Sequence, residues 1–252
     1  MAADSFLSVR GLGKSFAGRP AIQNVTFRLE RGHTLGLVGP SGSGKSTLAR
    51  CLALFETPTS GEIWLDGRNL CGHPRADVQL IFQEPASSLN PRFTAAQIVT
   101  EPLLIRGIGT ANTRRQRASE LMETVGLPGQ ALDKRALEFS GGERQRLAIA
   151  RALALEPKLL ILDESFAGLD LSVQAQVSDL LRGLQERHGL TYILISHDLA
   201  LVWSLAGEIA VMDHGGIVEH AAVADLLARP RHPLTRELLD AARALSLAGA
   251  PA

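Results

Sequence analysis

The residues with the clearest capacity for chemistry form one run, Gly39-Pro40-Ser41-Gly42-Ser43-Gly44-Lys45-Ser46-Thr47. Its spacing is that of a phosphate-binding loop, in which backbone N–H groups and the start of the next helix surround phosphate oxygens. In such a loop the ammonium group of Lys45 reaches the β- and γ-phosphates, and the Ser46 hydroxyl holds Mg²⁺. The run therefore predicts a phosphate site with a magnesium ion.

Two adjacent acids are a second candidate for chemistry. Asp163 and Glu164 end the continuous apolar run 158–162, and acids at the tip of a buried strand are costly unless they face a cation or a cleft. Near a phosphate-binding loop, Asp163 is predicted to orient Mg²⁺ and its water shell, and Glu164 to polarise the attacking water. The alternative is that both acids simply emerge into solvent.

Polar residues also follow two other apolar runs. Gln83 ends the run 78–82, and His197 follows the run 190–195. The carboxyl ends of parallel strands meet at one edge of an α/β sheet, where ligands bind. We therefore predict that His197 contacts the γ-phosphate, whereas Gln83 is either a ligand-facing residue or a polar cap on its strand.

A pair of glycines opens a predicted helix at Ser140-Gly141-Gly142-Glu143. Ser140 and Glu143 have the spacing of a capping box. Capping does not account for two glycines in the first turn, since each costs about 1 kcal/mol relative to alanine. Bare backbone at a helix N-terminus suits a phosphate, so this run is predicted to bind an anion.

The elements that must position these residues predict an α/β fold. Buried strands are expected at 34–38, 78–82, 158–162 and 190–195, with a helix over 48–55 after the phosphate-binding loop. Near the N-terminus, strands at 6–10 and 21–30 flank a turn that contains Phe16. From the residues alone, Phe16 is either a platform for an adenine ring or, more commonly for this residue type, a core plug.

Later segments complete the outline. Residues from about 86 to 150 lose strand-like runs and predict a helical insertion, including a helix over 113–125. A hairpin with a Gly-Gly turn is expected at 209–219, and the tail from about 221 is helical, broken by prolines.

Composition narrows the class of protein. Hydrophobic residues make up 45% of the 252, and 26 basic residues balance 26 acidic ones, so no net charge attracts nucleic acid. Cys51 and Cys71 form no C-x-x-C pair, so no disulfide framework or zinc site is expected. No signal peptide is expected at the start, and no apolar run approaches the roughly 20 residues of a membrane span.

Together these motifs resemble, in family order and over nearly the whole length, the nucleotide-binding subunit of an ATP-binding-cassette (ABC) transporter. The resemblance identifies Phe16 as the adenine-stacking aromatic, Gln83 as a catalytic and magnesium-binding glutamine, and Asp170 as a nucleotide-site residue. It implies a P-loop NTPase (RecA-like) fold with a mostly parallel sheet core, an N-terminal antiparallel β-subdomain and the helical insertion, all within one ATPase domain over 1–228. Residues 229–252 form a helical tail.

The resemblance also implies ATP and Mg²⁺ as cofactors and a head-to-tail dimer with a second ATPase subunit. ATP on one phosphate-binding loop is then sandwiched by Ser140, Gly141 and Gly142 of the partner subunit, in a homodimer or a heterodimer. Glu164 acts as the general base or water-orienting group, while Lys45 and His197 steady the γ-phosphate. Implied partners are two integral membrane permeases and, through them, a periplasmic or extracellular solute-binding protein, which places the chain peripherally on the cytoplasmic face of the cell membrane.

Two further segments resemble one group within this family. Residues 82–91 and 232–239 are similar to segments of the dipeptide, oligopeptide and nickel importer group. The expected function is therefore ATP hydrolysis that powers import of peptides or nickel-like metal chelates. The alternative is an ABC ATPase that serves a soluble enzyme complex, such as the phosphonate-cleaving assembly. Departures from the family pattern are Glu143, where Gln is usual, and Ser165-Phe166-Ala167-Gly168 after the acids.

Overall fold

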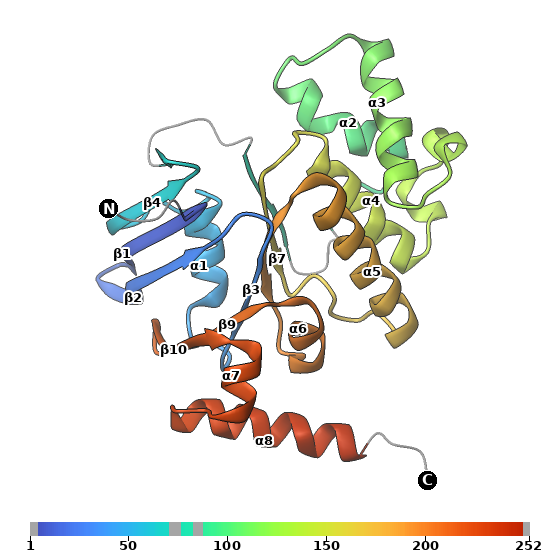
Figure 1. Ribbon diagram of the computed structural model, residues 1–252. Coiled ribbons are helices and arrows are strands. Elements are labelled where there is room, and N and C mark those ends of the chain that lie inside the picture. Colours follow the sequence, from blue (N-terminus) through green and yellow to red (C-terminus); the bar gives the residue numbers. More distant parts are fainter. Residues whose placement is uncertain (1–4, 71–76, 83–87, 249–252) are drawn as a thin grey trace. The chain divides into compact units, whose positions relative to one another are not determined.

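The computed structural model describes residues 5–70, 77–82 and 88–248 (Figure 1). The chain divides into two compact units, and each is described by itself. The first unit comprises residues 1–75 and 191–252, and the second comprises residues 76–190.

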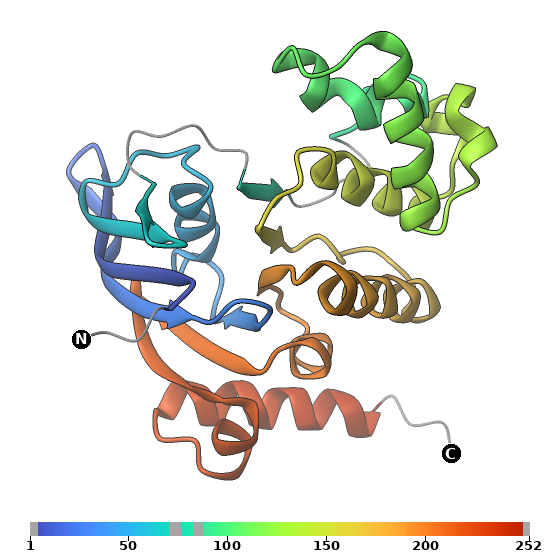
Figure 2. The same ribbon diagram turned by 45° about the horizontal axis from the view of Figure 1, so that its top comes forward.

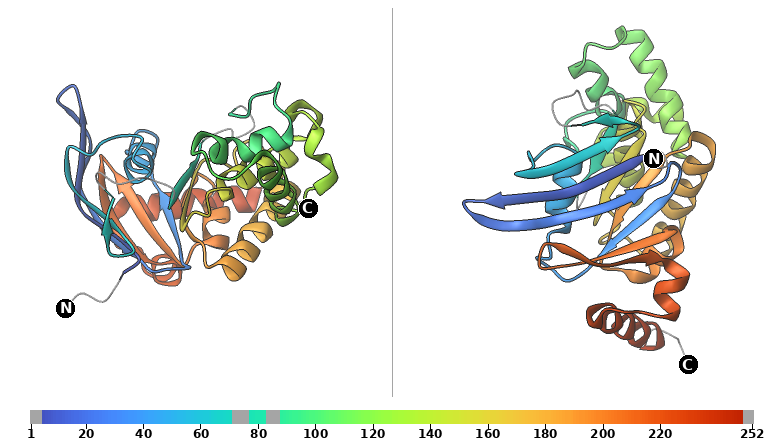
Figure 3. Two further views of the ribbon diagram at one scale, coloured as in Figure 1. Left: turned by 90° about the horizontal axis from the view of Figure 1, so that it is seen from above. Right: turned by 60° about the vertical axis from the view of Figure 1, so that its left-hand side comes forward.

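An antiparallel sheet forms the N-terminal part of the first unit. Strand β1 (Leu7–Phe16) pairs with β2 (Arg19–Leu29) and with β4 (Ser60–Leu65), and β5 (Arg68–Asn69) follows β4. Figure 3 shows β1 and β2 as two long neighbouring arrows. The buried side chains of β2 include those of Val25, Phe27 and Leu29, which alternate with exposed neighbours. This confirms the predicted antiparallel sheet, although β1 is longer than predicted and only Ala17-Gly18 remain for the turn.

The same unit holds the strands that carry the phosphate-binding loop. Strand β3 (Thr34–Val38) pairs in parallel with β8 (Thr191–Ile195) on one side and with β9 (Glu208–Asp213) on the other. Strand β10 (Gly216–Ala222) then pairs antiparallel with β9. Every residue of β3 and β8 is buried, as parallel strands covered on both faces require.

Two short helices accompany these strands, α1 (Lys45–Leu52) and α6 (Leu199–Leu205). The predicted continuation of α1 to Phe55 is wrong. Leu54 adopts a left-handed backbone with φ of +58°, which ends the helix, and the Phe55 side chain is 62% exposed.

The tail of the chain contains α7 (Val223–Ala228) and α8 (Pro233–Ala248). The carboxylate of Glu219, on β10, holds the start of α8 by accepting hydrogen bonds from the backbone N–H groups of Arg231 and His232 and from the Thr235 hydroxyl. Desolvation by burial raises the pKa of Glu219, but these hydrogen bonds outweigh it and the net pKa is lowered. The 232–239 segment therefore has a structural task in this chain.

The second unit begins and ends with α/β structure. Strand β6 (Val78–Ile81) pairs in parallel with β7 (Leu159–Asp163), and the long helix α5 (Leu171–His188) follows β7. All five residues of β7 are buried. The predicted strands at 78–82 and 158–162 are confirmed to within one residue.

Between β6 and β7 the described residues form helices and no strand, as predicted for a helical insertion. The helices are α2 (Ala95–Ile105), α3 (Ala111–Thr124) and α4 (Gly141–Leu153), with short 3-10 turns at Gly129–Asp133 and Ala136–Glu138. Figure 2 shows α2, α3 and α4 packed together. Of the helices in the described part of the chain, none is long and apolar enough to cross a membrane.

Candidate functional site

The phosphate-binding loop joins β3 to α1 and depends on glycine at particular positions. The backbone φ is +146° at Gly39, +79° at Gly42 and +103° at Gly44, conformations that glycine adopts without a steric cost. A Cβ atom on Gly39 would lie 2.1 Å from the carbonyl oxygen of Met212, and one on Gly44 would lie 2.7 Å from the carbonyl oxygen of Ala21. The loop is therefore packed tightly against its own unit at both ends.

Lys45 lies within this loop rather than in solvent. Its Nζ donates hydrogen bonds to the carbonyl oxygens of Gly39 and Pro40, both at 2.8 Å, and the residue is only 7% exposed. Ser46 and Thr47 lie in the first turn of α1. A cation held beside the first turn of a helix is an arrangement that fits the phosphates of a nucleotide.

The turn between β9 and β10 supports the loop, which the sequence did not predict. The N–H of Gly215 donates to the carbonyl oxygen of Ser43 at 3.0 Å, and the Gly215 carbonyl accepts from the N–H of Gln23 at 2.8 Å. The two turn residues are His214 and Gly215, with φ of +42° and +83°, as in hairpin turns of the primed type. The predicted Gly-Gly turn is thus wrong by one residue, because Gly216 begins β10.

His197 lies at the same sheet edge as the loop. In the parallel pair of β3 and β8, Leu37 is opposite Ile195, and Gly39 and His197 each lie two residues beyond this pair. His197 is exposed. The structure therefore brings the phosphate-binding loop and His197 to one edge, as the order of strands predicts.

Phe16 ends β1 and is not a core residue. Its side chain is 44% exposed, so the core-plug interpretation is wrong. The Nζ atom of Lys14 lies 4.8 Å from the centroid of the Phe16 ring. An exposed ring at a strand end is available for stacking with a planar ligand.

In the second unit, the two acids lie at the end of β7. Asp163 is the last residue of the strand and is 4% exposed, whereas Glu164 is partly exposed and has a left-handed backbone with φ of +47°. Such a conformation is uncommon for a residue other than glycine and is concentrated at functional sites. Ser165 and Phe166, two of the residues that depart from the family pattern, are both buried.

Gln83 lies outside the described residues. The strand that precedes it, β6, is in parallel register with β7, with Ile81 opposite Leu162. The ends of these two strands therefore lie side by side.

The predicted capping box at the start of α4 is confirmed. The N–H of Ser140 donates to the Glu143 carboxylate at 2.7 Å, and the N–H of Glu143 donates to the Ser140 hydroxyl at 3.3 Å. The hydrogen bonds with Ser140 lower the pKa of Glu143. A charged glutamate thus replaces the usual glutamine without loss of the cap.

The two glycines after Ser140 have different surroundings. A Cβ atom on Gly142 would lie 2.6 Å from Cγ1 of Val173 on α5, whereas nothing lies within 4 Å of the corresponding position on Gly141. Close packing of α4 on α5 therefore explains Gly142 structurally. The argument for anion binding from the cost of glycine applies to Gly141 alone.

We expect Gly142→Ala and Gly141→Ala to have opposite effects on stability. Val173 is β-branched and cannot easily move aside, so Gly142→Ala should lower the free energy of unfolding by about 1–3 kcal/mol. Gly141→Ala should raise it by about 0.5–1 kcal/mol. Urea unfolding without nucleotide measures both, and equal losses in the two variants would contradict this account.

Asp170 caps the start of α5. Its carboxylate accepts hydrogen bonds from the Val173 N–H at 2.9 Å and from the Ser172 hydroxyl at 2.8 Å, and these lower its pKa. Asp170 therefore has a local structural role, while its predicted place at the nucleotide remains a proposal.

The predicted residues fall into two groups. The first unit carries Phe16, the loop 39–47 and His197; the second carries Asp163, Glu164, Asp170 and the run at Ser140. Among the described residues no group of three or more His, Cys, Asp or Glu side chains gathers for a metal ion.

The loop geometry, with Lys45 inside it and β3 before it, defines a P-loop nucleoside triphosphatase. Residues 22–167 match the family described as ABC transporter. The chain is 47% identical over 246 residues to a putative peptide import ATP-binding protein of Brucella ovis, covering 93% of this chain and 78% of the relative. It is 46% identical to the dipeptide transport ATP-binding protein DppF of Escherichia coli, covering 88% and 68%.

A solved structure extends the comparison. The chain is similar to a dimeric post-hydrolysis state of the ATP-binding cassette MJ0796 bound to ADP and Pi, with a TM-score of 0.75 and 28% identity over 86% of this chain and 98% of the other. The chain belongs to the ABC transporter family. Within that family it is an ATP-binding subunit that hydrolyses ATP.

Proposed function

We propose that this chain powers an ABC importer of peptides. The observation that carries the proposal is the 47% identity over 93% of the chain to a protein named for peptide import, together with the similar DppF of Escherichia coli. These relatives favour the importer over a soluble phosphonate-cleaving complex. Import of nickel-like metal chelates is the second candidate substrate class, and it rests on the segments 82–91 and 232–239 alone.

In the proposed mechanism, ATP occupies the loop 39–47 of one subunit. Lys45, the first residue of α1, gives up its hydrogen bonds to backbone carbonyl oxygens and binds the β- and γ-phosphate oxygens instead. Phe16 stacks on the adenine. Ser46, Asp163 and Gln83 would hold Mg²⁺, and the ion would supply positive charge to neutralise the phosphates. Glu164 accepts a proton from the attacking water, and His197 steadies the γ-phosphate as charge develops.

The proposed active form is a head-to-tail dimer. Ser140 and Gly141 are exposed at the start of α4, and Leu171 at the start of α5 is 82% exposed, so this end of the second unit is open to a second subunit. In the dimer, Ser140, Gly141 and Gly142 close over the nucleotide bound by the second ATPase subunit, and Asp170 lies beside it. The solved relative with ADP and Pi is itself dimeric.

The proposed contact with the membrane partners is a cavity in the helical insertion. It measures about 430 Å³, and its lining includes Leu103, Ile108 and Leu155 with the basic residues Arg106, Arg114 and Arg117. Leu104 and Ile105 beside it are 61% and 78% exposed. A lining of apolar and basic side chains suits a short cytoplasmic segment that carries apolar and acidic side chains.

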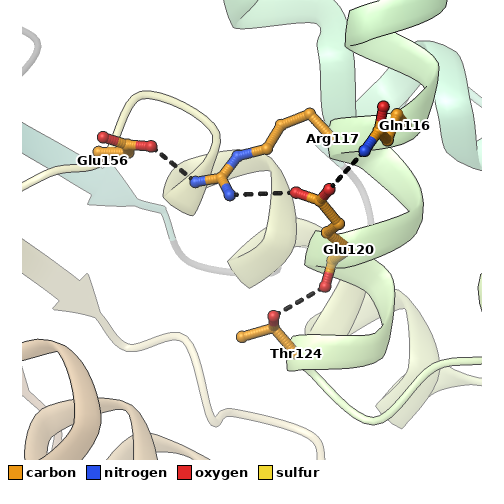
Figure 4. Close-up of polar contacts among 5 residues, drawn as sticks. All are labelled: Gln116, Arg117, Glu120, Thr124 and Glu156. Atoms are coloured by element: carbon orange, nitrogen blue, oxygen red, sulfur yellow. Dashed lines mark hydrogen bonds and ion pairs between the residues drawn. The ribbon is translucent and has the colours of Figure 1, made fainter.

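Two of the residues that line this cavity, Arg117 and Glu156, belong to a polar network (Figure 4). Arg117 donates to Glu156 at 2.8 Å and to Glu120 at 3.5 Å, and the Glu120 carboxylate also accepts from Gln116 at 3.1 Å. Arg117 is thereby balanced by two acids. Among the described residues no acid pairs with Arg106 or Arg114, so these two charges are proposed to receive a partner's carboxylates; Arg114 also donates to the backbone oxygens of Ile108 and Gly109.

Affinity purification from the native cells in mild detergent tests this function. We expect two integral membrane permeases and a second ATPase to remain bound, which would place the chain peripherally on the cytoplasmic face of the membrane. Arg106→Glu should release the permeases, whereas the matched variant Arg243→Glu, at an exposed position of α8, should retain them. A set of soluble enzymes with no membrane protein would overturn the importer and favour the enzyme-complex alternative.

A further inference from the structure

The Phe16 ring is contacted by the ammonium group of Lys14. Phe16 and Lys14 are two residues apart on β1, so their side chains leave the strand on the same side. The Lys14 Nζ lies 4.8 Å from the ring centroid. The ring nevertheless remains 44% exposed, so it is both contacted by a cation and open to a ligand.

The Lys14 ammonium group is fixed in place rather than mobile. It forms an ion pair with the Glu56 carboxylate at 2.9 Å and donates a hydrogen bond to the Thr57 carbonyl oxygen at 3.0 Å. The Lys14 side chain is only 13% exposed. A lysine in solvent samples many rotamers, whereas this one is held with its charge over the aromatic ring.

The residues that hold Lys14 are connected to the phosphate-binding helix. Glu56 follows α1, and the backbone N–H groups of Phe55 and Glu56 both donate to the Arg50 carbonyl oxygen within that helix. Lys14 therefore links the strand that carries Phe16 to the end of the helix that begins with Lys45. All of these residues belong to the first unit.

We propose that Lys14 is a positioning residue for the nucleobase of ATP. It holds the Phe16 ring at a fixed place relative to α1, and its charge on one face of the ring draws electron density away from the other face, where the base stacks. The proposal rests on the proposed stacking of adenine on Phe16. Lys14 itself touches the ring and not the phosphates, so its loss should weaken binding of the base alone.

The test compares ATP with inorganic tripolyphosphate, which fills the phosphate-binding loop but has no base. Dissociation constants for both are measured by calorimetry on the full chain. Lys14→Met keeps the aliphatic stem and removes the charge, and we expect about fivefold weaker ATP binding with unchanged tripolyphosphate binding. Lys14→Arg should restore most of the ATP affinity.

A double-mutant cycle separates an action through Phe16 from a general loss of structure. Phe16→Ala should weaken ATP binding by about tenfold, and adding Lys14→Met to it should cause no further loss. Arg31→Met is the matched control: Arg31 lies 4.4 Å from the ring of Phe6, which is buried, so removing this cation should leave both affinities unchanged. If Lys14→Met lowers the melting temperature too far for binding measurements, Glu56→Gln is the substitute variant. It removes the ion pair that holds the Lys14 ammonium group, and it should weaken the binding of ATP but not of tripolyphosphate.

Several results would overturn the proposal. These are ATP affinity within about twofold of the parent in Lys14→Met, an equal loss for tripolyphosphate, or the same loss in the Phe16→Ala background. Failure of the parent chain to bind ATP at all would instead overturn the proposed function and with it this inference.

Discussion

Glu164→Gln should bind ATP with near-parental affinity and hydrolyse it about 100-fold or more slowly. The amide has nearly the shape of the carboxylate but cannot accept a proton from water. Glu164 follows the buried β7, next to the 4%-exposed Asp163, and its left-handed backbone turns the chain at the strand end. Steady-state phosphate release measures turnover, and a fluorescent ATP analogue measures binding.

Glu186→Gln is the matched control for this substitution. Glu186 is an exposed acid near the end of α5 in the same unit, so its amide variant should hydrolyse ATP at the parental rate. Near-normal turnover by Glu164→Gln would show that another group accepts the proton. Loss of ATP binding in Glu164→Gln would show instead that the carboxylate is needed before the chemical step.

Gly39→Ala should destabilise the chain by about 3 kcal/mol or more and abolish nucleotide binding. Two costs add: about 1–3 kcal/mol for a side chain at φ of +146°, and about 1–3 kcal/mol for overpacking. The overpacking arises because the new Cβ would lie 2.1 Å from the Met212 carbonyl oxygen, which is backbone and cannot rotate away. The loop must therefore move, and Lys45 loses the Gly39 carbonyl that holds it.

Gly18→Ala isolates the first of these costs. Gly18 has φ of +80° with nothing within 4 Å of a new Cβ, so this variant should lose only about 1–2 kcal/mol. Urea unfolding gives the difference between the two variants, and ATP titration should show binding only in Gly18→Ala. Equal stability in the two variants would mean that the contact with Met212 is not tight.

The strands and the loop could be predicted from sequence because their signals are local. Mostly apolar runs marked β3, β6, β7 and β8, and the spacing of glycines with Lys45 marked the loop between β3 and α1. The capping box of Ser140 and Glu143 can likewise be recognised from four consecutive residues. In each case the residues that decide the structure are neighbours in the chain.

Two of the omissions have a different cause, which is contact between residues far apart in sequence. Gly142 is required by Val173, and the Gly215 turn supports Ser43, yet nothing in either local sequence gives the partner. Phe16 was first interpreted as a core residue because burial is the usual fate of phenylalanine, whereas its place at a strand end leaves it exposed. The contact between Lys14 and Phe16 could have been predicted from sequence, because side chains two residues apart in a strand lie on the same face of the sheet.

Because the β9–β10 turn contacts the phosphate-binding loop, a dye on this turn could report on the state of the loop. The His214 side chain is 97% exposed, and the next residue, Gly215, bonds to the Ser43 carbonyl of the loop. Burial raises the pKa of the Cys51 thiol to about 11, so this cysteine is sheltered from thiol-reactive dyes. With Cys71 replaced by serine, a dye attached to a cysteine at position 214 lies one residue from the loop contact. Its emission would then follow the filling and emptying of the loop in real time while the groups that bind the nucleotide stay unmodified.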